Sequence, residues 1–134
     1  MAIAADECER RAGLDADLRK LYAEPFPATR TGALYNAFSY PTKISAEAIG
    51  LFIATHTAPG DTVLDVFAGS GTTGIATILC ARPTAAMKQL AADLGLRPSW
   101  GPRRAVLYDI GVLGSFISRV MCDPPDPERF AAAA

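Results

Sequence analysis

Apolar side chains recur at helical spacing in separate stretches of the chain. In the stretch 45–57, Ile49, Phe52 and Ile53 fall on one face at i, i+3 and i+4. Ser45 is a favourable N-cap for this helix, because its hydroxyl can accept a hydrogen bond from a free N–H group of the first turn. Similar patterns predict helices over residues 6–22, 72–81, 84–94 and 112–121.

Two short apolar stretches between these helices predict strands. Thr62–Val66 and Ala105–Tyr108 are short and contain β-branched residues. The first is apolar enough to be buried on both faces of a sheet. Because helices separate the strands, we expect them to be parallel and joined by right-handed crossovers. The sequence therefore predicts an α/β fold with few parallel strands and flanking helices, in which the helix at 84–94 is an insertion between the two strands.

Glycine and proline residues indicate where the helices end. Gly13 is a possible break in the first helix, which would then be a helix pair. Thr84 is a predicted N-cap and Gly95 a predicted C-cap. Three prolines between Asp123 and Pro127 predict a segment without regular structure.

Composition and charge place the chain among globular proteins. It has 134 residues, of which 50% are hydrophobic and 20% charged, enough for one domain. The formal net charge of −1 gives no overall basic surface for nucleic acid, and we interpret the arginine pairs at 10–11 and 103–104 as solvated surface. The N-terminus lacks a signal-peptide pattern, and no apolar stretch is long enough for a bilayer. We expect a cytoplasmic protein with no membrane partner.

The cysteines and the single histidine do not form a metal-binding pattern. Cys8, Cys80 and Cys122 include no C-x-x-C pair, and His56 has no partner at metal-ligand spacing. We expect no metal and no nucleophilic cysteine. His56 lies near the end of the helix at 45–57, where the helix dipole favours a structural imidazole.

A glycine-rich segment joins the first predicted strand to the next helix. Gly69, Gly71 and Gly74 satisfy the pattern G-x-G-x-x-G. Such glycines let the backbone turn sharply and approach a ligand, while the helix N-terminus presents free N–H groups. We expect a side chain at Gly71 to occupy ligand space and to leave the fold intact. No lysine follows Gly71, which excludes a P-loop, and Phe67 separates the strand from the first glycine, which is unusual for a dinucleotide site.

The residues around these glycines narrow the choice of ligand. The segment Asp65-Val66-Phe67-Ala68-Gly69-Ser70-Gly71-Thr72 resembles motif I of the DNA methyltransferases that methylate N6 of adenine or N4 of cytosine. The resemblance implies a partial Rossmann-like fold of the S-adenosylmethionine-dependent methyltransferase type. It implies S-adenosyl-L-methionine as cofactor, with Asp65 and the N–H groups at Thr72–Thr73 complementing the charged amino-acid end.

Two further segments support the resemblance. Tyr40-Pro41-Thr42-Lys43 precedes motif I by one helix, as a short motif does in this family. Asp109 lies at the end of the second predicted strand, the position at which this family has the acidic residue that binds the cofactor ribose. The resemblance implies that the neighbouring Ile110 packs on the adenine ring. Asp109 lies 35 residues after the last loop glycine, whereas about 20 is usual. Asp93 has the usual spacing but lies in a predicted helix, so we favour Asp109. The implied cofactor contacts are Lys43, Asp65, Phe67, Ala68, Gly69, Gly71, Thr72, Thr73, Asp109 and Ile110.

The catalytic motif of this family has only an imperfect counterpart. It reads Asp/Asn/Ser-Pro-Pro-Tyr/Phe, and its polar side chain and aromatic ring hold an extruded base. Asp123-Pro124-Pro125-Asp126 matches three of the four positions, with Asp126 in place of the aromatic residue. The interval after Asp109 holds one helix and no third strand, so we interpret the segment as a proline-rich turn and keep Asp123, Pro124 and Pro125 as weak catalytic candidates.

The resemblance covers about residues 40–109, roughly half of the chain. We expect an N-terminal helical and extended segment at 1–39 and a partial methyltransferase cofactor-binding domain at 40–134. The expected function is methylation of an exocyclic amino group of adenine or cytosine in DNA. This chain would supply the cofactor-binding part, with a partner subunit or a missing C-terminal part completing the enzyme. Two alternatives stay open: a non-catalytic fragment that binds cofactor or a partner, and a dinucleotide-binding oxidoreductase module.

Overall fold

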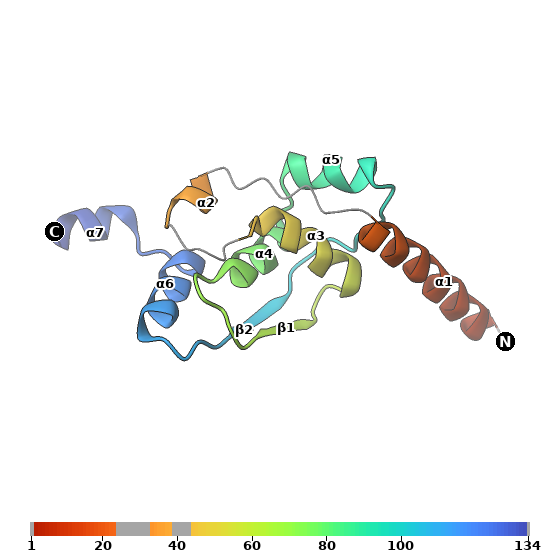
Figure 1. The fold of residues 1–134 in the computed structure, drawn as a ribbon, viewed down its shortest axis with the longest axis horizontal. Coiled ribbons are helices and arrows are strands. Elements are labelled where there is room, and N and C mark those ends of the chain that lie inside the picture. Colours follow the sequence, from red (N-terminus) through yellow and green to blue (C-terminus); the bar gives the residue numbers. More distant parts are fainter. Residues whose placement is uncertain (1, 24–32, 39–43, 134) are drawn as a thin grey trace.

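The computed structural model describes residues 2–23, 33–38 and 44–133 (Figure 1). Helices and strands alternate along the chain as the hydrophobic pattern predicts. The elements are α1 (Ala2–Ala23), α2 (Ala33–Asn36), α3 (Ala46–His56), β1 (Thr62–Asp65), α4 (Thr72–Ala81), α5 (Ala85–Asp93), β2 (Arg104–Leu107), α6 (Val112–Cys122) and α7 (Pro127–Ala133).

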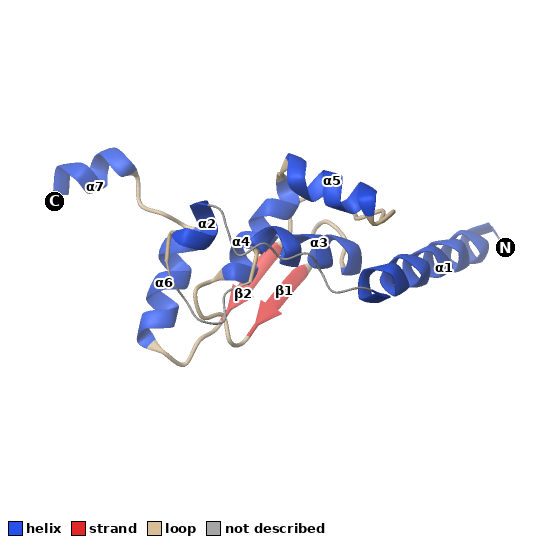
Figure 2. Cartoon of the chain, turned by 45° about the horizontal axis from the view of Figure 1, so that its top comes forward, coloured by secondary structure: helices blue, strands red, loops and turns tan. Residues whose placement is uncertain are grey.

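The two strands form a parallel sheet, as predicted. Their register runs from Thr62 opposite Arg104 to Asp65 opposite Leu107. α3 and α4 lie on the same side of this sheet, and no described helix covers its other face (Figures 1 and 2). Burial therefore alternates along β1, and Leu64 is 62% exposed. The prediction that β1 is buried on both faces is wrong, because among the described elements helices pack on one face only.

The core lies between α3, α4 and the covered face of the sheet. Ile53 and Ala54 of α3 meet Ala76 and Cys80 of α4, and all four are buried. Small residues let these helices approach closely: a Cβ atom on Gly50 would lie 3.2 Å from the carbonyl oxygen of Ala76. A second cluster attaches α1 and α5 to α3 through Leu21, Leu51, Ala91 and Leu96.

Three predicted helix caps are confirmed. The Ser45 hydroxyl accepts a hydrogen bond from the N–H of Ala48 at 3.4 Å, and Thr84 accepts one from Met87 at 3.1 Å. Gly95 follows α5 with a φ of 60°, which is the left-handed conformation that ends many helices. These signals act over one turn of helix, so the local sequence suffices to specify them.

One predicted break is absent, because α1 runs through Gly13. The segment predicted to lack regular structure does so from Asp123 to Asp126, and α7 begins at its last residue, Pro127. Asp126 accepts a hydrogen bond from the N–H of Arg129 at 2.9 Å, and proline suits the first helical position because no N–H donor is needed there.

Arg103 is bound within the fold, which corrects its interpretation as solvated surface. Its guanidinium donates to the hydroxyl and the carbonyl of Thr57, each at 2.8 Å, and to the carbonyl of Gly101 at 2.8 Å. A further hydrogen bond reaches the carbonyl of Ser99. These contacts fasten the end of α3 to the loop that leads into β2. The neighbouring Arg104 is exposed, as predicted.

We expect Arg103→Ala to lower the free energy of unfolding by about 2–4 kcal/mol, because hydrogen bonds from a charged group are lost and carbonyl groups lose their donors. Urea denaturation followed by circular dichroism measures this loss. Arg104→Ala is the matched control: it removes the same charge from an exposed side chain and should change stability by less than about 0.5 kcal/mol. Equal losses in the two variants would contradict a structural role for Arg103.

The domain boundary predicted after residue 39 lies outside the described residues, so this division stays a prediction.

Candidate functional site

The glycine loop follows β1 and turns the chain sharply into α4. Gly69 and Gly71 have φ values of 51° and 77°, a region that favours glycine. The N–H of Gly71 donates to the carbonyl of Ala68 at 2.7 Å, which closes the turn. Gly71 is the N-cap of α4 and supplies no side-chain cap. The free N–H groups of the first turn, at Thr72 and Thr73, therefore have no acceptor within the helix.

Asp65 organises this loop from the end of β1. One carboxylate oxygen accepts the N–H of Phe67 at 2.9 Å. The other accepts the hydroxyl of Thr73 at 2.6 Å. The carboxylate thus joins the start of the loop to the first turn of α4, which explains why an acid and a threonine stand at these two positions.

Asp109 joins the glycine loop to the end of β2. Its Oδ2 accepts the N–H of Gly69 at 2.8 Å, and its Oδ1 accepts the N–H of Gly111 at 2.8 Å. A backbone hydrogen bond of 2.9 Å from Ala68 to Tyr108 runs beside them. Two segments separated by 40 residues therefore meet at the carboxyl edge of the sheet.

Asp93, the alternative acid, is not part of this arrangement. It lies on α5, and its carboxylate accepts a hydrogen bond from the Gln89 side chain at 2.7 Å. Of the two candidates weighed on spacing, Asp109 is the one that contacts the loop.

Large apolar side chains are exposed close to the glycine loop. Phe67, within the loop, is 85% exposed, and Ile110, directly after Asp109, is fully exposed. Burying an aromatic ring of this size against a ligand would remove a large apolar area from water. Both residues are therefore available to contact a flat, apolar group.

Packing explains two glycines of the G-x-G-x-x-G pattern, Gly71 and Gly74, of which we expected Gly71 to contact the cofactor. A Cβ atom on Gly71 would lie 2.7 Å from the Cα of Ser118 in α6. One on Gly74 would lie 2.7 Å from a methyl group of Leu107 and would also collide with the Cys122 sulfur. The expectation that a Gly71 side chain enters ligand space and leaves the fold intact is therefore wrong. The sequence gives no local signal that α6 packs here.

Cys80 and Cys122 are poor nucleophiles. Burial raises the pKa of the Cys122 thiol. Burial also raises the pKa of Cys80, against a smaller opposing effect of Arg103. A raised pKa keeps a thiol protonated at neutral pH. Within the described ranges, no group of three or more His, Cys, Asp or Glu side chains is placed to hold a metal ion.

His56 connects two helices at a distance from the glycine loop. Its Nδ1 pairs with the Phe52 carbonyl at 2.7 Å and its Nε2 with the Tyr22 hydroxyl at 3.1 Å. The ring also stacks on Phe52, with centroids 5.9 Å apart. A neutral imidazole with its proton on Nδ1 satisfies both hydrogen bonds, so His56 holds α1 against α3.

Of the remaining predicted site residues, Asp123 lies near the loop: it lines a cavity of about 340 Å³ together with Asp109, and the thiol of the preceding Cys122 donates to the Gly71 carbonyl at 3.6 Å. Lys43, with the rest of Tyr40–Lys43, lies outside the described residues. Asp123, Pro124 and Pro125 form an exposed connection between α6 and α7. Asp126, at the aromatic position of the motif, caps α7, which accounts for its identity without a role in base stacking.

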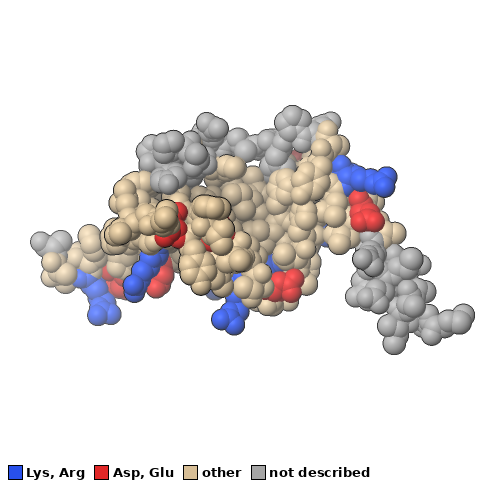
Figure 3. Space-filling model, turned by 60° about the horizontal axis from the view of Figure 1, so that its bottom comes forward, with Lys and Arg blue, Asp and Glu red and all other residues tan. Residues whose placement is uncertain are grey.

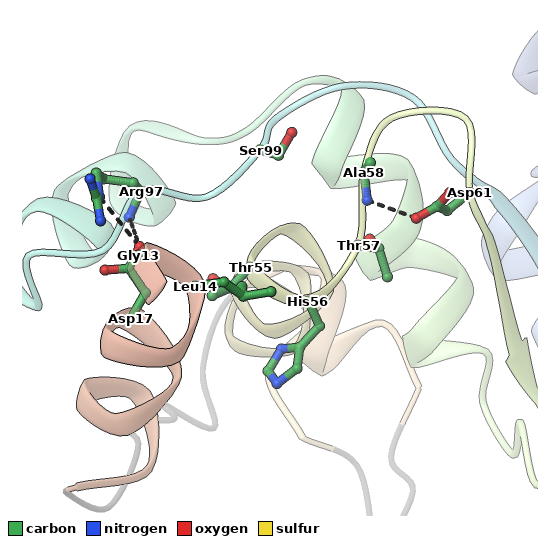
Figure 4. A pocket seen from close by; sticks show the side chains of 10 residues that line it. All are labelled: Gly13, Leu14, Asp17, Thr55, His56, Thr57, Ala58, Asp61, Arg97 and Ser99. Atoms are coloured by element: carbon green, nitrogen blue, oxygen red, sulfur yellow. Dashed lines mark hydrogen bonds and ion pairs between the residues drawn. The ribbon is translucent and has the colours of Figure 1, made fainter. Parts of the chain in front are cut away.

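A cavity of about 720 Å³ lies between α1, the end of α3 and residues 97–99 (Figure 4). Asp61 lines it just before β1, so the cavity lies at the amino edge of the sheet, opposite the glycine loop. Ligands of parallel α/β sheets bind at the carboxyl edge. Buried Asp17 accepts the N–H of Arg97 at 3.2 Å, and its unpartnered Oδ1 has no access to the cavity solvent. This cavity is therefore not our candidate site.

Comparison with known proteins identifies the family. The sequence model of an N6-adenine and N4-cytosine DNA methylase family matches residues 15–110. The chain belongs to this DNA methylase family. The matched range contains β1, the glycine loop and Asp109, and it ends before Asp123. No match was found among the curated proteins, and none among the solved structures.

No helix in the described part of the chain is long and apolar enough to cross a membrane.

Proposed function

We propose that this DNA methylase binds S-adenosylmethionine at the glycine loop and Asp109, and that the cofactor's methyl group goes to an exocyclic amino group of adenine or cytosine in DNA. The observation that carries the proposal is the 2.8 Å hydrogen bond from the Gly69 N–H to the Asp109 carboxylate. It brings together an acid able to bind ribose hydroxyls and a helix N-terminus able to bind a carboxylate.

The residues present suit this cofactor. Each Asp109 oxygen accepts one backbone N–H and keeps a lone pair for a ribose hydroxyl. Exposed Phe67 and Ile110 offer apolar surfaces for the adenine ring. The first-turn N–H groups at Thr72 and Thr73 suit the carboxylate of the amino-acid end. When bound, the cofactor supplies an electrophilic methyl group on a sulfonium.

We propose that Asp65 acts mainly by ordering the loop. Its two oxygens already accept hydrogen bonds from Phe67 and Thr73, and each keeps a lone pair that an ammonium group could use. Ala68, Gly69 and Gly71 contribute backbone to the same turn. Lys43 stays a proposed contact on the strength of the sequence resemblance alone.

The DNA contacts are proposed to come mostly from outside the described surface. On the face drawn in Figure 3, basic side chains stand beside acidic ones and form no basic band (Figure 3). Phosphate binding depends on clustered Lys and Arg side chains. The two parallel strands fit part of a Rossmann-like sheet, and we propose that a partner subunit or further chain supplies the base pocket. The alternative is a non-catalytic protein that binds cofactor, which the uncovered face of the sheet favours.

Asp109→Ala is expected to weaken S-adenosylmethionine binding more than tenfold, because the ribose hydroxyls lose a charged acceptor worth about 1.5–3 kcal/mol. Isothermal titration calorimetry on the purified chain measures the affinity. Asp93→Ala is the matched control and should leave affinity unchanged, because Asp93 lies on α5 and pairs with Gln89.

Three results would count against the proposed site. A larger loss in Asp93→Ala than in Asp109→Ala would contradict the choice of acid. Binding of NAD with none of S-adenosylmethionine would favour the oxidoreductase alternative. Absence of S-adenosylmethionine binding by the folded wild-type chain would overturn the cofactor assignment altogether.

A further inference from the structure

Gly114 lies in the first turn of α6, against the carboxylate of Asp109. It is buried, and a Cβ atom built on it would lie 2.7 Å from Oδ1, 2.8 Å from Cγ and 3.2 Å from Oδ2 of Asp109. Real Cβ atoms do not approach other atoms this closely, so any side chain at this position would displace the carboxylate. A side chain at position 114 is therefore compatible with the fold only if the Asp109 carboxylate moves.

Neither helix formation nor backbone conformation explains this glycine. Gly114 lies within the helical range of α6, where alanine is more favourable than glycine, and its φ is not in the left-handed region. The atoms that a Cβ atom on Gly114 would approach most closely all belong to the carboxyl group at the end of the Asp109 side chain. A substitution can therefore be absorbed by moving the Asp109 carboxylate, with little effect on the rest of the fold.

The position of this carboxylate is set by few contacts. Gly69 and Gly111 donate one backbone hydrogen bond each, both 2.8 Å long. A displacement large enough to clear a Cβ atom on Gly114 lengthens at least the bond to Oδ1 and rotates Oδ2 away from Gly69. The loop and the end of β2 would then lose the link through the Asp109 side chain and keep the backbone hydrogen bond from Ala68 to Tyr108.

We propose that Gly114 is a positioning residue of the cofactor site, which keeps the Asp109 carboxylate on the Gly69 N–H and aimed at the cofactor ribose. The inference rests on the proposed function, because the ribose contact is part of it. Gly114 itself touches no cofactor, and it acts only through Asp109.

Gly114→Ala should weaken S-adenosylmethionine binding at least fivefold in calorimetry, while the melting temperature does not fall. The matched control is Leu113→Ala, an exposed neighbour on the same turn of α6, which should leave affinity unchanged. In an Asp109→Ala background, where the colliding atoms are gone, Gly114→Ala should cause no further loss of affinity. Unchanged affinity in the single variant, or a full additional loss in the double variant, would overturn the proposal.

A cofactor-free measurement separates this proposal from the proposed function. Amide hydrogen exchange at Gly69 should accelerate in Gly114→Ala, because its acceptor has moved, and stay as in the wild type in Leu113→Ala. Unchanged exchange at Gly69 would overturn the positioning role, whatever the cofactor. If Gly114→Ala failed to fold, a folded Asp109→Ala/Gly114→Ala double variant would support the collision, and an unfolded one would refute it.

Discussion

Replacing Gly71 with alanine is expected to lower the free energy of unfolding by about 2–5 kcal/mol. Two costs add together. The φ of 77° is unfavourable for a residue with a side chain, by roughly 1–2 kcal/mol. The new Cβ atom would also lie 2.7 Å from the Ser118 backbone, so α6 must shift, and overpacking of this kind costs about 1–3 kcal/mol. Urea denaturation monitored by circular dichroism measures the total.

Gly60→Ala is the matched control for the backbone cost. Gly60 has a φ of 94°, and nothing lies within 4 Å of the position of its Cβ atom. This variant should therefore show the conformational cost alone, and the difference between the two variants reports the packing of α6 on the loop. Similar losses in both would mean that α6 does not pack against Gly71.

Because Gly71 packs against Ser118, a substitution at Gly71 is a poor test of cofactor binding. A substitution there disturbs α6 through Ser118, and α6 begins just after Asp109, so lost binding would have two explanations. The Asp109→Ala and Gly114→Ala variants avoid this ambiguity, because both alter the carboxylate and neither places a side chain against Ser118.

Local signals in the sequence predicted local structure well. The caps at Ser45, Thr84 and Gly95 depend on contacts within about one turn of helix, and all three are confirmed. The parallel pairing of the strands also followed, because a helix must cross between them. The position of Asp109 beside the loop could be expected from its place at the end of the second strand.

Features that depend on distant residues were missed or misread. The exposure of Leu64 depends on how many layers cover the sheet, which the four residues of β1 do not encode. The G-x-G-x-x-G pattern shows that side chains are excluded, but not that Ser118 excludes one of them. Arg103 looked like surface because its acceptors are backbone carbonyls, which every sequence contains.

Apolar side chains are exposed on α6 as well as on the uncovered face of the sheet. Val112, Leu113 and Phe116 are all exposed, close to one another on the helix surface. Leu64, on the uncovered face of the sheet, adds exposed apolar area, and monomeric proteins seldom leave large contiguous apolar patches in water. This surface supports the proposal that another chain or segment completes the enzyme.

The 134-residue chain alone is expected to transfer no detectable methyl group to DNA. Transfer requires an extruded base held in line with the sulfonium methyl, within about 3–3.5 Å. Asp123-Pro124-Pro125 is exposed, although it directly follows Cys122, whose thiol lies 3.6 Å from the Gly71 carbonyl oxygen. Asp126 caps α7 and offers no aromatic face. A tritiated-methyl assay on mixed-sequence DNA, run on protein shown by calorimetry to bind cofactor, measures the activity.

Cofactor binding without methyl transfer would agree with a chain that contributes the cofactor site to a larger enzyme. Self-association in analytical ultracentrifugation should accompany it, since the edges of the two-stranded sheet and the apolar stripe on α6 are open. Asp123→Ala provides the decisive comparison. If the wild-type chain were a stable monomer that labelled DNA, and Asp123→Ala lost that activity while still binding cofactor, then Asp123, Pro124 and Pro125 would be the catalytic motif.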